Sequence, residues 1–362
     1  NPMISLYKTK HTGKHMIDKI DELDHPDSIW TWKTAKGRRK ATLWLPYFQS
    51  VEKAKPKSKF FYRFNYNGGS FEADLRLIDC IMIYGATGNL PVSFLDSLSV
   101  QRIHLLIHRR GMPQPYVFLP SQGNQSNDSL TAQILTRNHT NKRIYIARSL
   151  IKARLTTISL TVPLADAVFK RLNSSRSLSE IRNIEAQATK RYWRSYYNSL
   201  GLTDAIRRDK TLPINQALDA CSFFLFGIIL RWVTLHRLSP WHGFLHEPTT
   251  YASLCYDLME PYRYWFEDAA KTAWSEDWND PKEVTSRTLS RLKEELETSV
   301  RVPQTRQIVA RKNLLHGITL ALLSYLNGVS QRFVVPSEGI KRVGRPLKSD
   351  YRIPGGKLKD EW

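Results

Sequence analysis

The spacing of hydrophobic and polar residues changes once along the chain and divides it into two regions. Between residues 28 and 120 hydrophobic and polar positions alternate, as in TLWLPYF and FYRFNYNGGSFEADLRLIDCIMIYG. Successive side chains of a strand point to opposite faces, so this alternation predicts β-strands, with Asn67-Gly68 as a hairpin turn. Further short strands are expected near 103–107 and 116–119. The region is therefore predicted to be a small β-sheet domain resembling a β-sandwich.

A polar stretch at 121–129 is interpreted as a linker, and after it the hydrophobic period becomes that of an α-helix. Candidate helices cover 130–155, 162–173, 177–200, 213–237, 249–275, 281–298 and 303–329. This pattern predicts a larger all-α domain over 130–335 and an α+β fold class overall. Neither period extends into the two ends, so we expect an arm or linker at 1–27 and a basic flexible tail at 336–362.

The charge of the chain points to a polyanionic partner. Its 54 Lys and Arg residues exceed its 33 Asp and Glu residues, which gives a formal net charge of +21 over 362 residues. Such a surplus attracts nucleic acid or an acidic membrane surface. The longest hydrophobic run, Phe223 to Val233, contains Arg231 and is shorter than the roughly 20 residues of a membrane span. The three cysteines form no CxxC pair, as is usual in a reducing cytosol. These features favour a cytoplasmic protein that binds nucleic acid and no membrane.

Against this basic background, acids gather in the stretch GFLHEPTTYASLCYDLMEPYRYWFED. Asp257 and Glu260 are three residues apart and should share one face of a helix. Pro261 should kink that helix directly after Glu260, and His246 should lie on a turn that folds back over it. The opposite, hydrophobic stripe is expected to face the core and consists of Leu254, Leu258, Tyr262 and Trp265.

A further acid, Glu185, stands in the strongly helical stretch SEIRNIEAQATKRYWRSYY among several basic residues. Taken alone, Glu185 has an ordinary interpretation as the ion-pair partner of a neighbouring arginine. A histidine such as His246, taken alone, is more often a core residue than a metal ligand. No single one of these residues defines a site.

Together the stretches IRNIEAQATKRYWRSYY, PINQALDACSFFLF and WHGFLHEPTTYASLCYDLMEPYR resemble the CRISPR-associated protein one family, the spacer-acquisition integrases. In that family an acid precedes small residues and an aromatic pair, as Glu185 precedes Tyr192 and Trp193. A GFLH segment then leads to an aspartate and an acid before a proline, here Asp257, Glu260 and Pro261. The motifs lie between residues 181 and 263, and the order of the two domains extends the resemblance to most of the chain.

The resemblance implies a divalent-metal site formed by the catalytic residues Glu185, His246 and Glu260, with Asp257 close by as a further candidate ligand. Two carboxylates and one imidazole suit Mg²⁺ or Mn²⁺ and leave positions open for water and phosphate oxygens. The implied reaction is a transesterification in which a DNA 3′-hydroxyl attacks a phosphodiester of the repeat array. The nucleophile then belongs to the DNA, and no protein side chain needs to be activated for attack.

Basic residues near the implied site are candidates for DNA contacts. Those that flank the acids are Arg182, Lys190, Arg191, Arg194 and Arg263, and Lys152 is a weaker candidate on the first long helix. The alternative for each is ordinary solvated surface charge. In the tail, Arg345 lies in KRVGRPLK, which resembles a minor-groove hook as much as a plain basic tail.

The resemblance also implies partners. We expect prespacer and CRISPR-repeat DNA, a homodimer with dimerisation or DNA contacts in the N-terminal domain, the CRISPR-associated protein two, and in some members a fused or associated reverse transcriptase. A prokaryotic cytoplasmic location follows. Two alternatives remain open at the level of sequence: a related transposase-type integrase, and a non-catalytic nucleic-acid-binding scaffold whose acids only neutralise arginines.

Overall fold

The computed structural model describes residues 30–33, 39–54, 59–66, 69–85, 88–109, 112, 114–120, 126–274, 280–339 and 351–358. The chain divides into two compact units, one up to Gln125 and one from Ser126 onwards. This division falls inside the stretch that the sequence analysis interprets as a linker. The predicted arm at 1–27, the turn at Asn67-Gly68 and Arg345 all lie outside the described residues.

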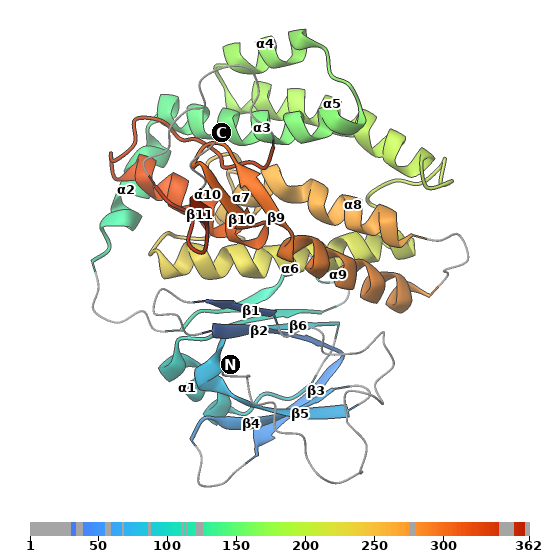
Figure 1. Cartoon of the computed structure of the whole chain (residues 1–362), viewed down its shortest axis with the longest axis vertical. Helices are drawn as coiled ribbons and strands as arrows, with labels where there is room; N and C mark the ends of the chain where they lie inside the picture. The colour runs from blue at the N-terminus through green and yellow to red at the C-terminus, as the bar shows by residue number, and fades with distance from the viewer. Residues whose placement is uncertain are drawn as a thin grey trace. The chain divides into compact units, whose positions relative to one another are not determined.

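Two sheets form the N-terminal unit (Figure 1). The larger has the order β1-β2-β6-β7-β8, with β2, β6 and β7 parallel and antiparallel strands at both edges. Its strands are β1 (Trp30–Lys33), β2 (Arg39–Pro46), β6 (Ile78–Tyr84), β7 (His104–His108) and β8 (Tyr116–Phe118). The smaller sheet is an antiparallel meander of β3 (Phe48–Lys53), β4 (Phe61–Tyr66) and β5 (Gly69–Asp74). The predicted small β-sheet domain is confirmed.

One helix of this unit, α1 (Val92–Gln101), was not predicted. It connects β6 to β7, which are parallel neighbours and therefore need a crossover. Phe94 and Leu98 of α1 join the hydrophobic core, together with Leu43 of β2 and Phe64 of β4. Short, serine-rich helices have little stability of their own, so packing against the sheets decides that this segment is helical.

The second unit is mainly helical (Figure 1). Its helices are α2 (Asp128–Asn138), α3 (Thr140–Thr161), α4 (Asp166–Ser174), α5 (Leu178–Asn198), α6 (Pro213–Leu235), α7 (Ser253–Met259), η3 (Glu260–Tyr262), α8 (Arg263–Ala273), α9 (Pro281–Glu297) and α10 (Lys312–Leu326). Helix α6 is the core helix and packs against α7, α8, α9 and α10. By length and composition α6 could cross a membrane, but 83% of its most hydrophobic window is buried inside this unit.

The predicted helix over 130–155 is two helices, because the chain turns at His139. The backbone of His139 is extended, and its ring Nδ1 accepts a hydrogen bond from the backbone N–H of Lys142 at 3.4 Å, which caps α3. The predicted kink after Glu260 is confirmed, because α7 ends at Met259 and the Glu260–Tyr262 segment, with Pro261, is a turn of 3₁₀-helix before α8.

The description of this unit as all-α needs a correction. The region from 299 to 310, placed largely in a helix by the sequence analysis, forms the hairpin of β9 (Ser299–Val302) and β10 (Gln307–Ala310). Arg306, in the turn, has φ 54°, a left-handed conformation that a helix excludes. The third strand of this sheet, β11 (Lys357–Leu358), pairs with β10.

The pairing of β11 also corrects the prediction of a flexible tail for part of its length. Ile353 is 1% exposed, and its backbone N–H and carbonyl both bond to the side-chain amide of Gln307, at 2.9 and 3.0 Å. Gly317 of α10 makes room for it, because a Cβ there would lie 3.1 Å from the Ile353 side chain. The segment of residues 351–358 is therefore part of the helical unit.

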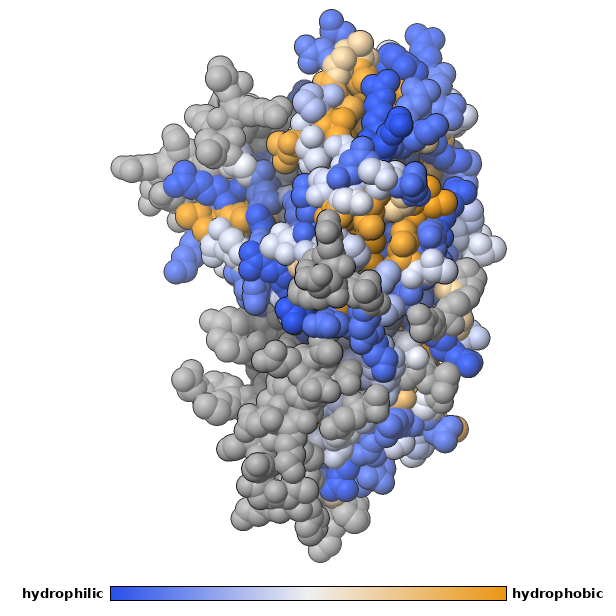
Figure 2. Space-filling model, turned by 90° about the vertical axis from the view of Figure 1, so that its right-hand side faces the viewer, coloured by the Kyte–Doolittle hydropathy of each residue, from blue (hydrophilic) through white to orange (hydrophobic). Residues whose placement is uncertain are grey.

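Most of the described surface in Figure 2 is hydrophilic, with several separate hydrophobic patches. The large hydrophobic side chains that are more than half exposed come from many elements, among them Val92, Leu135, Leu160, Ile206 and Val329. Scattered exposed hydrophobic residues are ordinary for a folded protein.

Candidate metal and nucleic-acid site

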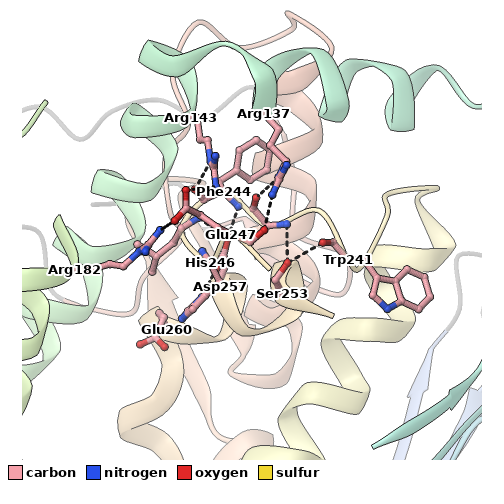
Figure 3. A network of polar contacts seen from close by, with 12 residues as sticks. Arg137, Arg143, Arg182, Trp241, Phe244, His246, Glu247, Ser253, Asp257 and Glu260 are labelled. Atoms are coloured by element: carbon pink, nitrogen blue, oxygen red, sulfur yellow. Dashed lines mark hydrogen bonds and ion pairs between the residues drawn. The ribbon is translucent and has the colours of Figure 1, made fainter. Parts of the chain in front are cut away.

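A buried carboxylate organises the loop that precedes α7 (Figure 3). Asp257 is fully buried, and its Oδ2 accepts hydrogen bonds from the backbone N–H groups of Phe244 and Leu245 at 2.5 and 2.8 Å. Its Oδ1 accepts a hydrogen bond from the backbone N–H of His246 at 3.1 Å and lies 2.6 Å from Nδ1 of the same residue. The imidazole is thus held through Nδ1, which leaves Nε2 as the nitrogen available to a ligand.

Gly243 begins this loop because a side chain would not fit there. A Cβ at Gly243 would lie 2.7 Å from Oδ2 of Asp257 and 3.0 Å from Oγ of Ser253. The Ser253 hydroxyl accepts a hydrogen bond from the Gly243 N–H at 3.0 Å and donates one to the Trp241 carbonyl at 2.9 Å. The glycine, serine and aspartate of the motif therefore act together to fold the loop over the start of α7.

Glu260 lies at the 3₁₀ turn among arginines. Its Oε1 is 3.1 Å from the Arg263 guanidinium, and its Oε2 is 4.0 Å from Nε of Arg154. Burial tends to raise the pKa of this carboxyl, but Arg263, Arg154 and His246 outweigh burial and lower it. Oε2 is buried and makes no hydrogen bond to any residue that the structure describes.

Glu185 is brought to the same place by α5, the helix that packs against α3. The hydroxyl of Thr189 donates a hydrogen bond to it at 2.6 Å. Burial, and then the negative charge of Glu260, raise the pKa of the Glu185 carboxyl. This effect of one carboxylate on another indicates that the acids of α5 and η3 share one region.

His246 responds to the same charges. Burial on its own would lower the pKa of the imidazole, but the hydrogen bond to Asp257, and the charges of Asp257, Glu260 and Glu185, raise it. Of the four residues that the sequence analysis grouped, His246 and Asp257 are in direct contact, and Glu185 and Glu260 lie near enough for their charges to act on the imidazole.

The donor types fit a divalent cation, and two observations agree with one. Oε2 of Glu260 is a buried oxygen that a cation would satisfy, and the pKa of Glu185 is raised by burial and by the charge of Glu260, both of which a cation would offset. As the side chains stand, no group of three or more His, Cys, Asp or Glu residues within the described ranges is arranged to hold a metal ion. Glu260 is paired with Arg263 instead.

Sequence reasoning missed a buried ion pair behind these acids. Arg154 of α3 forms two hydrogen bonds to Glu267 of α8, at 2.9 and 2.7 Å, and the two side chains are 1% and 0% exposed. Arg263 also approaches Glu267, at 3.6 Å. The two residues of the pair are 113 positions apart, so no local pattern could have identified it.

A second missed group consists of arginines of α2 and α3 that contact the 243–247 loop (Figure 3). Arg137 and Arg143 donate to backbone carbonyls of the loop, and Arg182 of α5 is paired with Glu247 at 2.6 Å. The hydrogen bond from Arg182 is the main cause of a lowered pKa at Glu247. Arg182, a candidate for DNA contact, therefore lies at the edge of the acidic site.

Three other DNA candidates form one exposed face of α5. Lys190, Arg191 and Arg194 line a groove of about 300 Å³ together with Gln187. None of the three basic residues is paired with an acid in the part of the chain that the structure describes. This face can accept phosphates without breaking an existing ion pair.

The remaining candidates are placed differently. Arg263 is directed at Glu260 and Glu267, and its side chain is 26% exposed. Lys152 is exposed on α3.

The fold was compared with solved structures. A casposase bound to its integration product aligns with 84% of this chain and 96% of that chain, with a TM-score of 0.67 and 18% identity. A Cas1 protein from Thermotoga maritima aligns with 82% of this chain and 99% of that one, with a TM-score of 0.63 and 18% identity. A chain of the Cas6-RT-Cas1–Cas2 complex aligns over 82% of this chain and 36% of its own length, with a TM-score of 0.65 and 14% identity. The fold is that of the Cas1 and casposase class.

Sequence comparison gives the family. An endonuclease Cas1 from Pyrococcus horikoshii is 25% identical over 240 residues, which are 59% of this chain and 74% of the relative. A Cas1 endonuclease from Saccharolobus solfataricus is 32% identical over 117 residues, 30% of this chain and 33% of the relative. The family profile described as CRISPR associated protein Cas1 matches residues 56–288. The chain belongs to the Cas1 family, which confirms the resemblance seen in the motifs, and these comparisons support an enzyme of the nuclease and integrase class.

Proposed function

We propose that the protein is a divalent-metal-dependent DNA endonuclease and integrase of CRISPR adaptation. It would insert new spacer DNA into the repeat array by transesterification from a DNA 3′-hydroxyl. The observation that carries the proposal is the buried, unsatisfied Oε2 of Glu260 in the same charged region as Glu185 and His246, in a chain of the Cas1 family.

In this proposal Glu185, His246 and Glu260 hold Mg²⁺ or Mn²⁺, and Asp257 orients the His246 imidazole through its contact with Nδ1. The bound ion would polarise the phosphodiester and lower the pKa of the attacking hydroxyl. The exchange makes one P–O bond for each that it breaks, so it needs no external energy source. The protein residues position the reactants, and the exposed basic face of α5 holds the DNA backbone.

Partners follow from the same proposal. Prespacer and repeat DNA match the surplus of positive charge, and the structural neighbour assembled as Cas6-RT-Cas1–Cas2 supports Cas2 as a companion, with a reverse transcriptase fused or associated. In this proposal the protein acts as a homodimer in the cytoplasm of a prokaryotic cell.

The casposase neighbour favours one second candidate, a transposase-type integrase that acts on the ends of a mobile element. The two functions differ in the target and not in the chemistry. Integration assays with a CRISPR repeat and with a mobile-element end, run side by side, would distinguish them. A non-catalytic scaffold would bind DNA equally with and without Mn²⁺ and join no strands.

The first prediction concerns the three proposed metal ligands. Glu185→Ala, His246→Ala and Glu260→Ala should each abolish strand transfer, while DNA affinity stays within about a few-fold of the wild type. Ligands position the metal, whereas phosphates are held mainly by arginines and lysines. Strand transfer with Mn²⁺ and DNA binding in EDTA measure the two effects separately.

Glu283→Ala on α9 is the control for this test, because it removes an acid that, among the described residues, pairs within its own helix, with Arg287 at 2.9 Å. It should integrate normally. Near-normal integration by one of the three site variants would remove that residue from the metal site.

A further inference from the structure

Two arginines beside the 243–247 loop are held in place by the backbone. Arg137 donates from Nε to the carbonyl of Gly243 and from its terminal nitrogen to the carbonyl of Glu247, both at 2.8 Å. Arg143 donates from Nε to the carbonyl of Phe244 at 3.0 Å. These bonds do not involve the Glu247 carboxylate, so the two guanidinium groups would keep their positions if that carboxylate moved away.

The Glu247 side chain is held much more weakly than the arginines around it. Its carboxylate is 2.6 Å from a terminal nitrogen of Arg182 and 3.9 Å from one of Arg143, and the Glu247 side chain is 55% exposed. Ion pairs this exposed are weak, because solvent screens the two charges. The fully buried pair of Arg154 and Glu267 has no such freedom, because separating it would leave buried charges without partners.

The carboxylate also leaves donors unused. The terminal NH2 group of Arg143 and Nε of Arg182 are buried and have no hydrogen-bond partner among the described residues. Buried donors without acceptors are costly, and guanidinium groups are well suited to tetrahedral phosphates. The Glu247 carboxylate thus lies beside two guanidinium groups and leaves some of their N–H donors without a hydrogen bond.

We propose that Glu247 occupies the place of a substrate phosphate between Arg143 and Arg182, and that a DNA phosphodiester displaces it. The inference rests on the proposed function for the identity of this anion. Because Glu247 directly follows His246, the phosphate would bind next to the proposed metal site. The Glu247 carboxylate then acts as an internal competitor. It lowers the affinity for DNA, and it pairs with the arginines when no DNA is bound.

The test is the affinity for a short fluorescein-labelled DNA duplex in EDTA, measured by anisotropy on the full chain. Glu247→Gln removes the competing charge, keeps the shape of the side chain, and should tighten binding by about twofold to fivefold, the range expected for an exposed ion pair. Arg182→Gln should weaken binding. In the Arg182→Gln background, the gain from Glu247→Gln should largely disappear, because the carboxylate has lost its main partner.

Glu294→Gln is the matched control. Glu294 is a similarly exposed glutamate, 68% against 55%, paired with an arginine at 3.1 Å on α9, and its loss changes the net charge equally. If Glu294→Gln tightened DNA binding as much as Glu247→Gln does, the effect would come from the change in net charge alone, which would overturn the proposal. So would an equal gain in both Arg182 backgrounds, or a lower melting temperature of Glu247→Gln without tighter binding, which would make Glu247 a structural support.

Strand transfer, measured separately with Mn²⁺, distinguishes this inference from the function on which it rests. Coupling between Glu247 and Arg182 in a protein that joins no strands would keep the phosphate subsite and remove the integrase. Strand transfer in a protein without that coupling would keep the integrase function and remove the phosphate subsite.

Discussion

At the scale of single residues, Asp257 is the residue on which the site depends most. It is fully buried, and three consecutive backbone N–H groups and one ring nitrogen bond to its carboxylate. Sequence spacing grouped it with the proposed metal ligands, but its contacts make it the support of His246. A carboxylate that is already saturated with hydrogen bonds is suited to orient a ligand and has little capacity left to be one.

Asp257→Asn should therefore destabilise the protein and impair strand transfer together. The amide replaces one acceptor oxygen with a donor, so at least one buried N–H loses its partner, which costs about 1–3 kcal/mol. Urea unfolding measures the stability, and integration with Mn²⁺ measures the activity. Asp219→Asn is the control, since Asp219 pairs with Arg207 and Lys210 away from the loop, at 2.7 and 2.5 Å. Wild-type stability of Asp257→Asn would contradict this assignment.

At the scale of elements, pairs of polar side chains join helices that are distant in sequence. Arg154 and Glu267 join α3 to α8 behind the proposed site, and His236 and His316 join the end of α6 to α10. The two imidazole Nε2 atoms are 2.7 Å apart, and the His316 ring stacks on Trp232 at 3.6 Å. Such pairs fix how the helices pack against one another, which hydrophobic contact alone specifies less narrowly.

The histidine pair predicts an acid-sensitive stability. Burial, and then the charge of Arg231, lower the pKa of His236; burial, His236 and Arg231 lower that of His316. Below the ordinary pKa of about 6.5 the unfolded chain therefore binds protons that the folded chain does not. The stability of the folded protein consequently decreases as the pH is lowered. His316→Phe keeps a stacking ring and should reduce this loss by up to about 1.4 kcal/mol per pH unit.

Urea unfolding between pH 7 and pH 5 measures the effect. His139→Asn, which changes an exposed histidine and keeps a side chain able to cap α3, should retain the wild-type dependence. An unchanged slope for His316→Phe would mean that the pair titrates normally in the folded protein.

At the scale of the whole molecule, the chain combines a surplus of basic residues with a few acids held in one buried region. The formal charge of +21 favours association with a polyanion, and the acids would provide the place for chemistry on it. The C-terminal segment of residues 351–358 returns to the helical unit and closes its small sheet. The end of the described chain thus contributes to the unit that contains the proposed site.

Ile353→Ala tests that contribution. Removing a fully buried isoleucine side chain should cost about 2–5 kcal/mol. The control is Val329→Ala, because Val329 is 64% exposed and its truncation should change stability little. Equal unfolding midpoints in urea for the two variants would mean that the segment does not pack on the helical unit in solution.

Much of the fold could be predicted from periodicity, because that signal is local. Helices α5 and α6 lie close to their expected limits, and the kink at Pro261 follows from the missing N–H of proline. The failures occur where packing outweighs a local preference: α1 on its sheets, the β9–β10 hairpin that was expected to be helical, and β11 in the supposed tail. In each of these short segments, contacts with distant residues determine the conformation.

The sequence by itself determined the order of a β-rich and a helical unit, the basic charge and the family, because each depends on residue types or on spacings within a few turns. Only the tertiary structure decided which side chains meet. Glu185 of α5 lies near enough to Glu260 for their charges to interact, Arg154 pairs with Glu267 across 113 positions, and Glu247 pairs with Arg182 across 65. These meetings depend on how helices pack. Packing is set by the shapes and polar pairs of whole faces, which no spacing along the chain records.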